Sequence, residues 1–178
     1  MKKLVLGMLL GLVFVAIGAT VFITAGAFPL AASSPPDMMD NLALDVRNRT
    51  IKKKARAITS VPGEAGPESI RRGLVHYREN CLPCHSAPDA SPAEFAQGLN
   101  PMPPALQVDM VQAWSDTELF WIVKNGMRLT GMPAFSVNHK DEEIGDIVRF
   151  VRHLPKLTDE EKKLLQAPAE AGEEHHHH

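Results

Sequence analysis

The feature that most constrains this chain is the position of its only two cysteines. Cys81 and Cys84 lie three residues apart, and His85 follows directly, in the segment NCLPCHSAP at 80–88. A disulfide across two intervening residues is strained and leaves the histidine unexplained. The pattern therefore indicates one local site built from two thiols and an imidazole.

Cys-x-x-Cys-His is the signature of covalent haem attachment, with the two thiols forming thioethers and the histidine facing the iron. A disulfide-exchange site is expected beside a strand–helix unit, and the sequence around Cys81 has no such pattern. A zinc site requires four ligands, and the other histidines ahead of the C-terminal tail are scattered. Haem attachment is the interpretation that also accounts for His85.

The N-terminal segment predicts a transmembrane helix. Residues 4–28 carry no charged side chain, and as a helix they extend roughly 37 Å, enough to cross a hydrocarbon core of about 30 Å. Lys2 and Lys3 favour a cytoplasmic N-terminus. The alternative for residues 1–28 is a cleaved signal peptide, whose apolar region spans only about 7–15 residues. Either interpretation sends the rest of the chain across the membrane.

Composition divides the remainder into three parts. Residues 29–66 are predicted to be a linker bounded by Pro-, Ser- and Gly-rich stretches, and residues 67–165 a compact domain. Residues 166–178 are predicted to be a flexible tail. The four histidines at 175–178 belong either to a purification tag or to a natural tail, and they are not candidate metal ligands of the domain.

The linker contains a predicted basic helix near residues 37–58, with a rough apolar stripe of Met38, Leu42, Val46 and Ile51. Six basic and three acidic side chains give residues 37–60 a net charge of +3, whereas 11 basic and 18 acidic side chains give residues 61–178 a net charge of −7. The basic helix suits anionic headgroups, a partner subunit or solvent. The acidic domain argues against a nucleic-acid partner.

The compact domain is predicted to be all-α, because no alternating run is long enough for a strand. Helices are expected over about 68–79, from 116 to Gly126 after the capping box SDTE, and over about 142–154 before Pro155. The segment 86–112 is long, rich in proline and without period. A loop of this length inside a compact domain suggests that something other than protein fills the core.

A methionine is the expected second iron ligand. A thioether opposite the histidine keeps small molecules from binding the iron and raises its reduction potential. Met132 lies between a glycine and a proline, in a loop directly after a helix, where the backbone can approach a flat cofactor. Met127, at the helix end, is the second candidate. For Met102 and Met110, packing in the core or on the surface is the default.

Residues 68–158 resemble a class I c-type cytochrome. The resemblance covers about half the chain and rests on GLVHYRENCLPCH, PMPPAL, WSDTELFWIVKNGMRLTGMPAF and DIVRFVRHLP. It implies an all-α class I cytochrome c fold around one covalent haem c, here joined to one N-terminal transmembrane helix. The sequence departs from the family in one place, where Ser86 stands at a position that is often glycine.

The resemblance also implies roles for individual residues. Cys81 and Cys84 attach the haem, and His85 and Met132 bind its iron. A proline carbonyl, of Pro104 or of its neighbour Pro103, accepts a hydrogen bond from the other ring nitrogen of His85.

Two further features of the family have counterparts here. Trp114 and Trp121 either lie near the haem or its propionates, or are ordinary core aromatics. The first and last helices of the family cross closely through a glycine and an aromatic residue. That crossing is matched by Gly73 and Tyr77 against Ile147 and Phe150.

The predicted function is therefore single-electron transfer rather than catalysis. The chain is expected to be a monohaem cytochrome held by its N-terminal helix in the bacterial inner membrane, with the haem domain in the periplasm. Its partners would be respiratory or photosynthetic redox proteins, met either as a tethered shuttle or as a subunit of a larger complex. The alternative is a haem enzyme or gas sensor in which Met132 is displaceable.

Overall fold

A computed structural model describes residues 2–26 and 30–166, and all regular secondary structure in these two ranges is helical. The all-α prediction is thereby confirmed for the described residues. The chain separates into two compact units, Met1–Pro35 and Pro36–His178. The predicted junction of anchor and linker at 28–29 and the tail from residue 167 onward, with its four histidines, lie outside the described residues.

The first unit is built on helix α1 (Lys2–Thr24), which buries none of its side chains within the protein. It is long and apolar enough to cross a membrane. The hydroxyls of its two threonines donate hydrogen bonds to backbone oxygens of the same helix. Thr20 donates to Ala16 at 2.8 Å, and Thr24 donates to Thr20 at 2.9 Å. No polar hydrogen of these threonines is left without an acceptor in an apolar surrounding.

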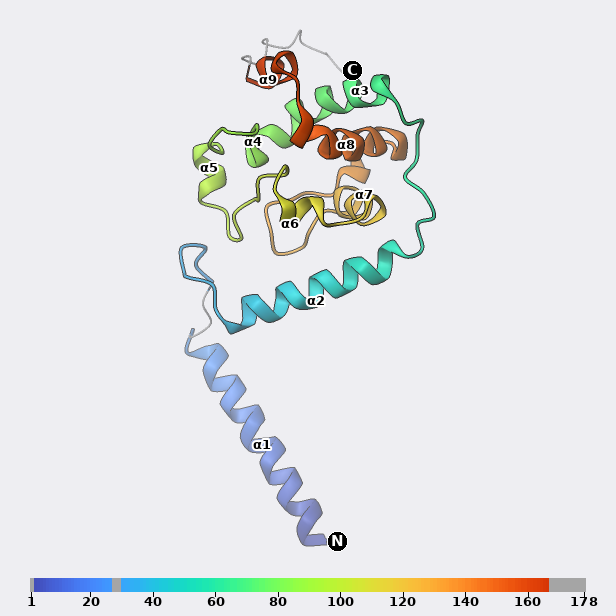
Figure 1. Ribbon diagram of the computed structural model, residues 1–178. Helices are drawn as coiled ribbons and strands as arrows, with labels where there is room; N and C mark the ends of the chain where they lie inside the picture. The colour runs from blue at the N-terminus through green and yellow to red at the C-terminus, as the bar shows by residue number, and fades with distance from the viewer. Residues whose placement is uncertain (1, 27–29, 167–178) are drawn as a thin grey trace, which may run out of the picture. The chain divides into compact units, whose positions relative to one another are not determined.

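The second unit contains the remaining helices (Figure 1), and most of them contribute buried residues to one apolar core. In chain order they are α2 (Met38–Ala55), α3 (Pro67–His76), a π-helical turn (Tyr77–Cys81), α4 (Leu82–His85), α5 (Glu94–Gln97), α6 (Asp109–Gln112), α7 (Asp116–Asn125), a 3-10 turn (Phe135–Val137), α8 (Asp141–His153), a second 3-10 turn (Leu154–Lys156) and α9 (Asp159–Gln166).

Helix α7 follows the sequence signals closely. The Ser115 hydroxyl accepts from the backbone N–H of Glu118, and the Glu118 carboxylate accepts from the backbone N–H of Ser115 at 2.7 Å, which completes the predicted capping box. Gly126 ends the helix with φ 64°, a left-handed conformation that favours glycine. The boundaries of α7 are therefore encoded locally.

Helices α3 and α8 cross in close contact at Gly73. A Cβ at this position would lie 2.2 Å from the backbone oxygen of Asp146 and 2.7 Å from Cβ of Phe150. The ring of Tyr77 packs against that of Phe150 with centroids 5.3 Å apart. The expected crossing through a glycine and an aromatic pair is thus confirmed, with Asp146 and Phe150 as the residues nearest Gly73.

Asp146 lies at the same crossing, and its exposed fraction is 3%. Ser69 donates to it at 2.5 Å and Arg72 at 2.6 Å, both from α3, while Arg149 lies 3.6 Å away. Burial by itself raises the pKa of Asp146, but the bonds from Arg72 and Ser69 outweigh it and hold the pKa below its usual value. A buried carboxylate thus fastens α3 to α8.

We expect Asp146→Asn to lower the free energy of unfolding at neutral pH by about 2 kcal/mol, because it removes the buried charge that pairs with the half-exposed Arg72. The depressed pKa makes the contribution of Asp146 complete above the unfolded-state pKa of about 3.9, and it is lost as pH falls through the folded-state pKa. Denaturant unfolding at a series of pH values measures both effects. Glu68→Gln, which breaks the exposed pair with Arg71, serves as the control. A variant as stable as the parent at neutral pH would contradict this role.

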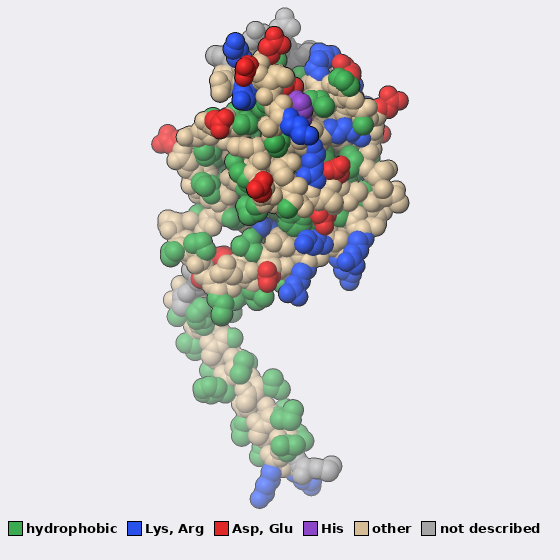
Figure 2. All heavy atoms as spheres, in the orientation of Figure 1, with side chains coloured by type: hydrophobic (Ala, Val, Ile, Leu, Met, Phe, Trp, Pro, Cys, Tyr) green, Lys and Arg blue, Asp and Glu red, His purple; other side chains and the backbone are tan. Residues whose placement is uncertain are grey.

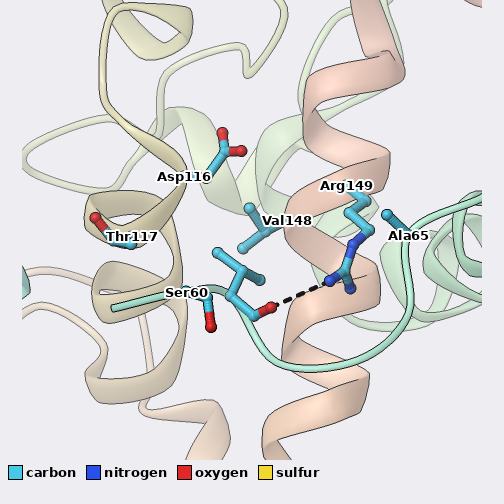
Figure 3. A pocket seen from close by; sticks show the side chains of 7 residues that line it. Ser60, Ala65, Asp116, Thr117, Val148 and Arg149 are labelled. Atoms are coloured by element: carbon cyan, nitrogen blue, oxygen red, sulfur yellow. Dashed lines mark hydrogen bonds between the residues drawn. The ribbon is translucent and has the colours of Figure 1, made fainter. Parts of the chain in front are cut away.

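Helix α2 and the segment after it belong to the second unit. Ile51 and Ala55 are buried, and α2 packs against α7. Arg149 of α8 donates to the backbone oxygen of Val61 at 3.2 Å and of Gly63 at 2.7 Å, beside a cleft shown in Figure 3. The sequence predicts that the compact domain starts at residue 67, whereas the second compact unit of the structure starts at Pro36. The unit is longer because α2 and the segment after it pack against the helices that follow residue 67.

The apolar stripe expected on α2 holds for Met38, Leu42 and Val46, which share one side of the helix, and is wrong for Ile51. Ile51 is buried, but Met38, Leu42 and Val46 are exposed. The reason is helical geometry, since Ile51 follows Val46 by five residues and is therefore rotated about 140° from it. The face of α2 that packs against the domain is centred on Ile51 and Ala55.

Candidate functional site

The Cys-x-x-Cys-His segment is held at the end of α3 by a widened turn. The predicted helix over 68–79 ends as an α-helix at His76, and the chain continues through the π-helical turn into α4. The buried hydroxyl of Tyr77 donates to the backbone oxygen of Ser86 at 2.7 Å. Burial raises the pKa of Tyr77, so the hydroxyl remains a donor. This bond closes the motif back onto the helix that precedes it.

Ser86, the residue that departs from the family pattern, has φ 56° and ψ 170°. This is a region that glycine adopts without penalty and that strains a residue with a Cβ. Its N–H donates to the backbone oxygen of Leu82 at 3.0 Å. The turn after the motif therefore keeps a glycine-like conformation although the residue is serine.

His85 is oriented by a proline carbonyl. Its Nδ1 lies 2.7 Å from the backbone oxygen of Pro104. A carbonyl can only accept, so Nδ1 carries the proton and Nε2 presents a lone pair. Burial lowers the pKa of His85, and the bond to Pro104 opposes this in part. The imidazole is thereby kept in the neutral form that binds metals.

The two cysteines are free thiols one turn apart. Cys81 is buried and Cys84 is half-buried. Burial raises the pKa of Cys81 to about 12. The thiolate is the reactive form of cysteine, so the buried Cys81 thiol is less reactive than an exposed one.

Met132 lies in a loop braced by its own hydrogen bonds. The N–H of Met127 donates to the backbone oxygen of Met132 at 3.1 Å. The Thr130 hydroxyl donates to the oxygen of Met127 at 2.7 Å and accepts from the N–H of Met132 at 3.1 Å. These three bonds fix the backbone on both sides of Met132 without any other element.

A glycine lets this loop return to the end of α7. A Cβ on Gly126 would lie 2.5 Å from the backbone carbon and oxygen of Pro133. Any side chain there would push Pro133, and with it Met132, away from the helix. The side chain of Met132 is half-buried and packs against the core.

The other methionines differ in exposure. Met102 and Met110 have exposed side chains, whereas Met127 is half-buried. Exposure makes the first two poor candidates for a ligand that must be shielded from water. Met127 remains the second candidate ligand.

Trp114 is half-buried and packs against the core. Lys52 of α2 places its Nζ 5.7 Å from the centroid of the indole ring, and Arg152 of α8 donates to the backbone oxygen of Trp114. Trp121 lines a cleft with residues of α2 and the segment after it. Trp114 therefore connects α2, α8 and the chain leading into α7, a role that its sequence position did not indicate.

The donor set fits a covalently attached haem. Cys81 and Cys84 are unpaired thiols, His85 offers Nε2, and Met132 offers a thioether from a fixed loop. Within residues 2–26 and 30–166, no group of three or more His, Cys, Asp or Glu side chains is placed to hold a metal ion. A zinc centre built from protein ligands alone therefore has no support in this part of the chain.

Comparison with known proteins gave one family match. Residues 68–151 match the family model described as cytochrome C oxidase, cbb3-type, subunit III. The matched stretch runs from α3 to α8 and includes Cys81, Cys84, His85 and Met132. No curated protein matches the chain.

Proposed function

We propose that this chain, whose residues 68–151 form a c-type cytochrome domain of the cbb3 oxidase subunit III family, is a membrane-anchored monohaem carrier of single electrons. The family carries covalently bound haem c and serves electron transfer. One observation carries the proposal for this chain. His85, which directly follows the two free thiols in the sequence, is oriented by its hydrogen bond to the backbone oxygen of Pro104.

Each residue of the site has a separate role in this proposal. Cys81 and Cys84 would attach the cofactor, and His85, through Nε2, and Met132 would bind its iron. Pro104 holds the imidazole ring in one orientation and makes Nε2 a stronger donor.

When bound, haem c gains and loses one electron at its iron. The protein's contribution is to keep the ligands where they are in both oxidation states. The hydrogen bonds around Met132 hold its loop, and the bond to Pro104 holds the ring of His85. Both proposed ligands can therefore keep their positions when the oxidation state changes. The proposed ligand set leaves no iron position for a substrate, so we assign the chain to electron carriers rather than to enzymes.

The anchor and the partners follow from the rest of the chain. We propose that α1 holds the protein in the bacterial inner membrane, with Lys2 and Lys3 in the cytoplasm and the haem domain in the periplasm. The match of residues 68–151 to the oxidase subunit family supports a redox partner within a respiratory complex. A photosynthetic partner or a tethered shuttle is compatible with the same site.

The proposal is tested by producing the full chain in a host that matures c-type cytochromes. Extraction into acidified acetone and the pyridine haemochrome spectrum then report whether the haem is covalent. We expect one haem per chain that stays with the protein, and loss of covalent haem in Cys81→Ala/Cys84→Ala. Colourless protein, or pigment released by acid acetone from the parent chain, would refute the proposal.

Carbon monoxide separates the carrier from the alternative of a haem enzyme or gas sensor. With Met132 fixed as the ligand, the spectrum of the reduced protein should change little on addition of the gas. A rapid and tight spectral shift would favour the alternative. The three hydrogen bonds that brace the loop of Met132 support the first outcome.

A further inference from the structure

Helix α2 has an apolar and basic face that no described residue of the second unit covers. Met38, Leu42 and Val46 have exposed fractions of 81%, 57% and 56%. They recur at intervals of four residues and therefore share one side of the helix. The buried residues Ile51 and Ala55 lie on the opposite side, against the domain.

Basic side chains continue the same face toward the C-terminus of α2. At about 100° per residue, Arg49, Lys53 and Arg56 fall within the arc spanned by Met38 and Val46. All three are exposed. Lys and Arg side chains gather along the C-terminal half of α2 in Figure 2. Asp45 is the acidic residue at the edge of this arc.

We propose that this face of α2 docks on the anionic phospholipid surface from which the chain emerges. Apolar side chains at one end and basic side chains at the other suit a helix that lies in the headgroup region of a membrane. We call this set, Met38, Leu42, Val46, Arg49, Lys53 and Arg56, the outer face of α2.

Chain length keeps α2 near the membrane. Helix α1 ends at Thr24 and α2 begins at Met38, so the 13 residues between them can span at most about 47 Å. The proposal rests on α1 being a retained anchor, as argued under the proposed function. A protein partner would have to compete with a lipid surface that is always within reach of α2.

The charge distribution also favours an orientation in which α2 faces the membrane. Residues 37–60 carry a net charge of +3, whereas residues 61–166 hold 11 basic and 15 acidic side chains, a net charge of −4. An anionic surface therefore attracts the outer face and repels the rest of the domain. Because α2 packs against α7, docking α2 also fixes the orientation of the domain that carries the site.

The test uses the full-length protein in nanodiscs of phosphatidylcholine alone or with phosphatidylglycerol added. Hydrogen–deuterium exchange of the amides of residues 39–46 is followed by mass spectrometry. We expect exchange to be at least threefold slower in the anionic discs, and high salt to remove most of this difference. The readout does not depend on haem, so it separates failure of docking from failure of the proposed electron transfer.

Two double variants with the same change of net charge show whether protection depends on the outer face of α2 or only on net charge. Arg49→Glu/Lys53→Glu should abolish the protection. Lys156→Glu/Lys163→Glu, at exposed positions beyond α8, should retain it. Equal exchange in the two kinds of disc, or equal loss in both variants, would overturn the proposal. Protection that appears only on addition of a purified membrane-protein partner would also overturn it and assign the face to that partner.

Discussion

Replacing Met132 with alanine is expected to abolish the near-infrared sulfur-to-iron band while leaving the haem covalently attached. The thioether favours the reduced iron, so its loss should lower the reduction potential by on the order of 0.1 V or more, within the span of about 0.8 V that axial ligands control. Absorption spectroscopy and a potentiometric titration of the holoprotein measure the two effects.

Two other methionine variants make this result specific. Met102→Ala alters an exposed side chain and should leave both the band and the potential unchanged. Met127→Ala should keep the band, because Met127 contributes its backbone to the loop. A band retained in Met132→Ala and lost in Met127→Ala would transfer the ligand assignment to Met127.

Replacing Gly73 with alanine is expected to lower the free energy of unfolding by about 3 kcal/mol or more. The added Cβ would lie 2.2 Å from a backbone oxygen of α8, which cannot move aside as a flexible side chain can. Helices α3 and α8 would have to separate, which would strain the packing around Phe150 and the bonds to Asp146. Chemical denaturation followed by circular dichroism measures the change.

Gly98→Ala is the matched control for this experiment. Its nearest contact for a new Cβ is a backbone oxygen at 3.5 Å, and its φ of −86° suits alanine. We expect the free energy of unfolding of this variant to stay within about 0.5 kcal/mol of the parent. If Gly73→Ala were no more destabilising than Gly98→Ala, the close crossing of α3 and α8 would not limit stability.

The sequence signals for the candidate site are local. Cys81, Cys84 and His85 are adjacent in sequence, and Met132 is marked by the glycine and proline beside it. Pro104 was expected only through the resemblance, since no local rule connects it to His85 across 19 residues. The assignment of these residues to a haem remains a prediction for the experiments above.

The contacts that hold α3 against α8 were only partly predictable. The crossing at Gly73 followed from the family resemblance, whereas the buried role of Asp146 did not. Asp146 lies in an acidic stretch that resembles a solvated helix surface, and its partners Ser69 and Arg72 are more than 70 residues away. A polar group of this kind is buried only because the fold supplies its partners.

By itself, the sequence determined what depends on neighbouring residues. The apolar run of α1, the two ends of α7 and the thiol–imidazole turn follow from side chains within a few positions of one another. Only the tertiary structure decided which face of α2 is covered and that residues 56–66 pack along α8. Those outcomes depend on surfaces such as that of Gly145, where a Cβ would lie 2.1 Å from the backbone oxygen of Pro62. Burial is a property of the assembled surfaces, and a periodic pattern along one helix does not specify it.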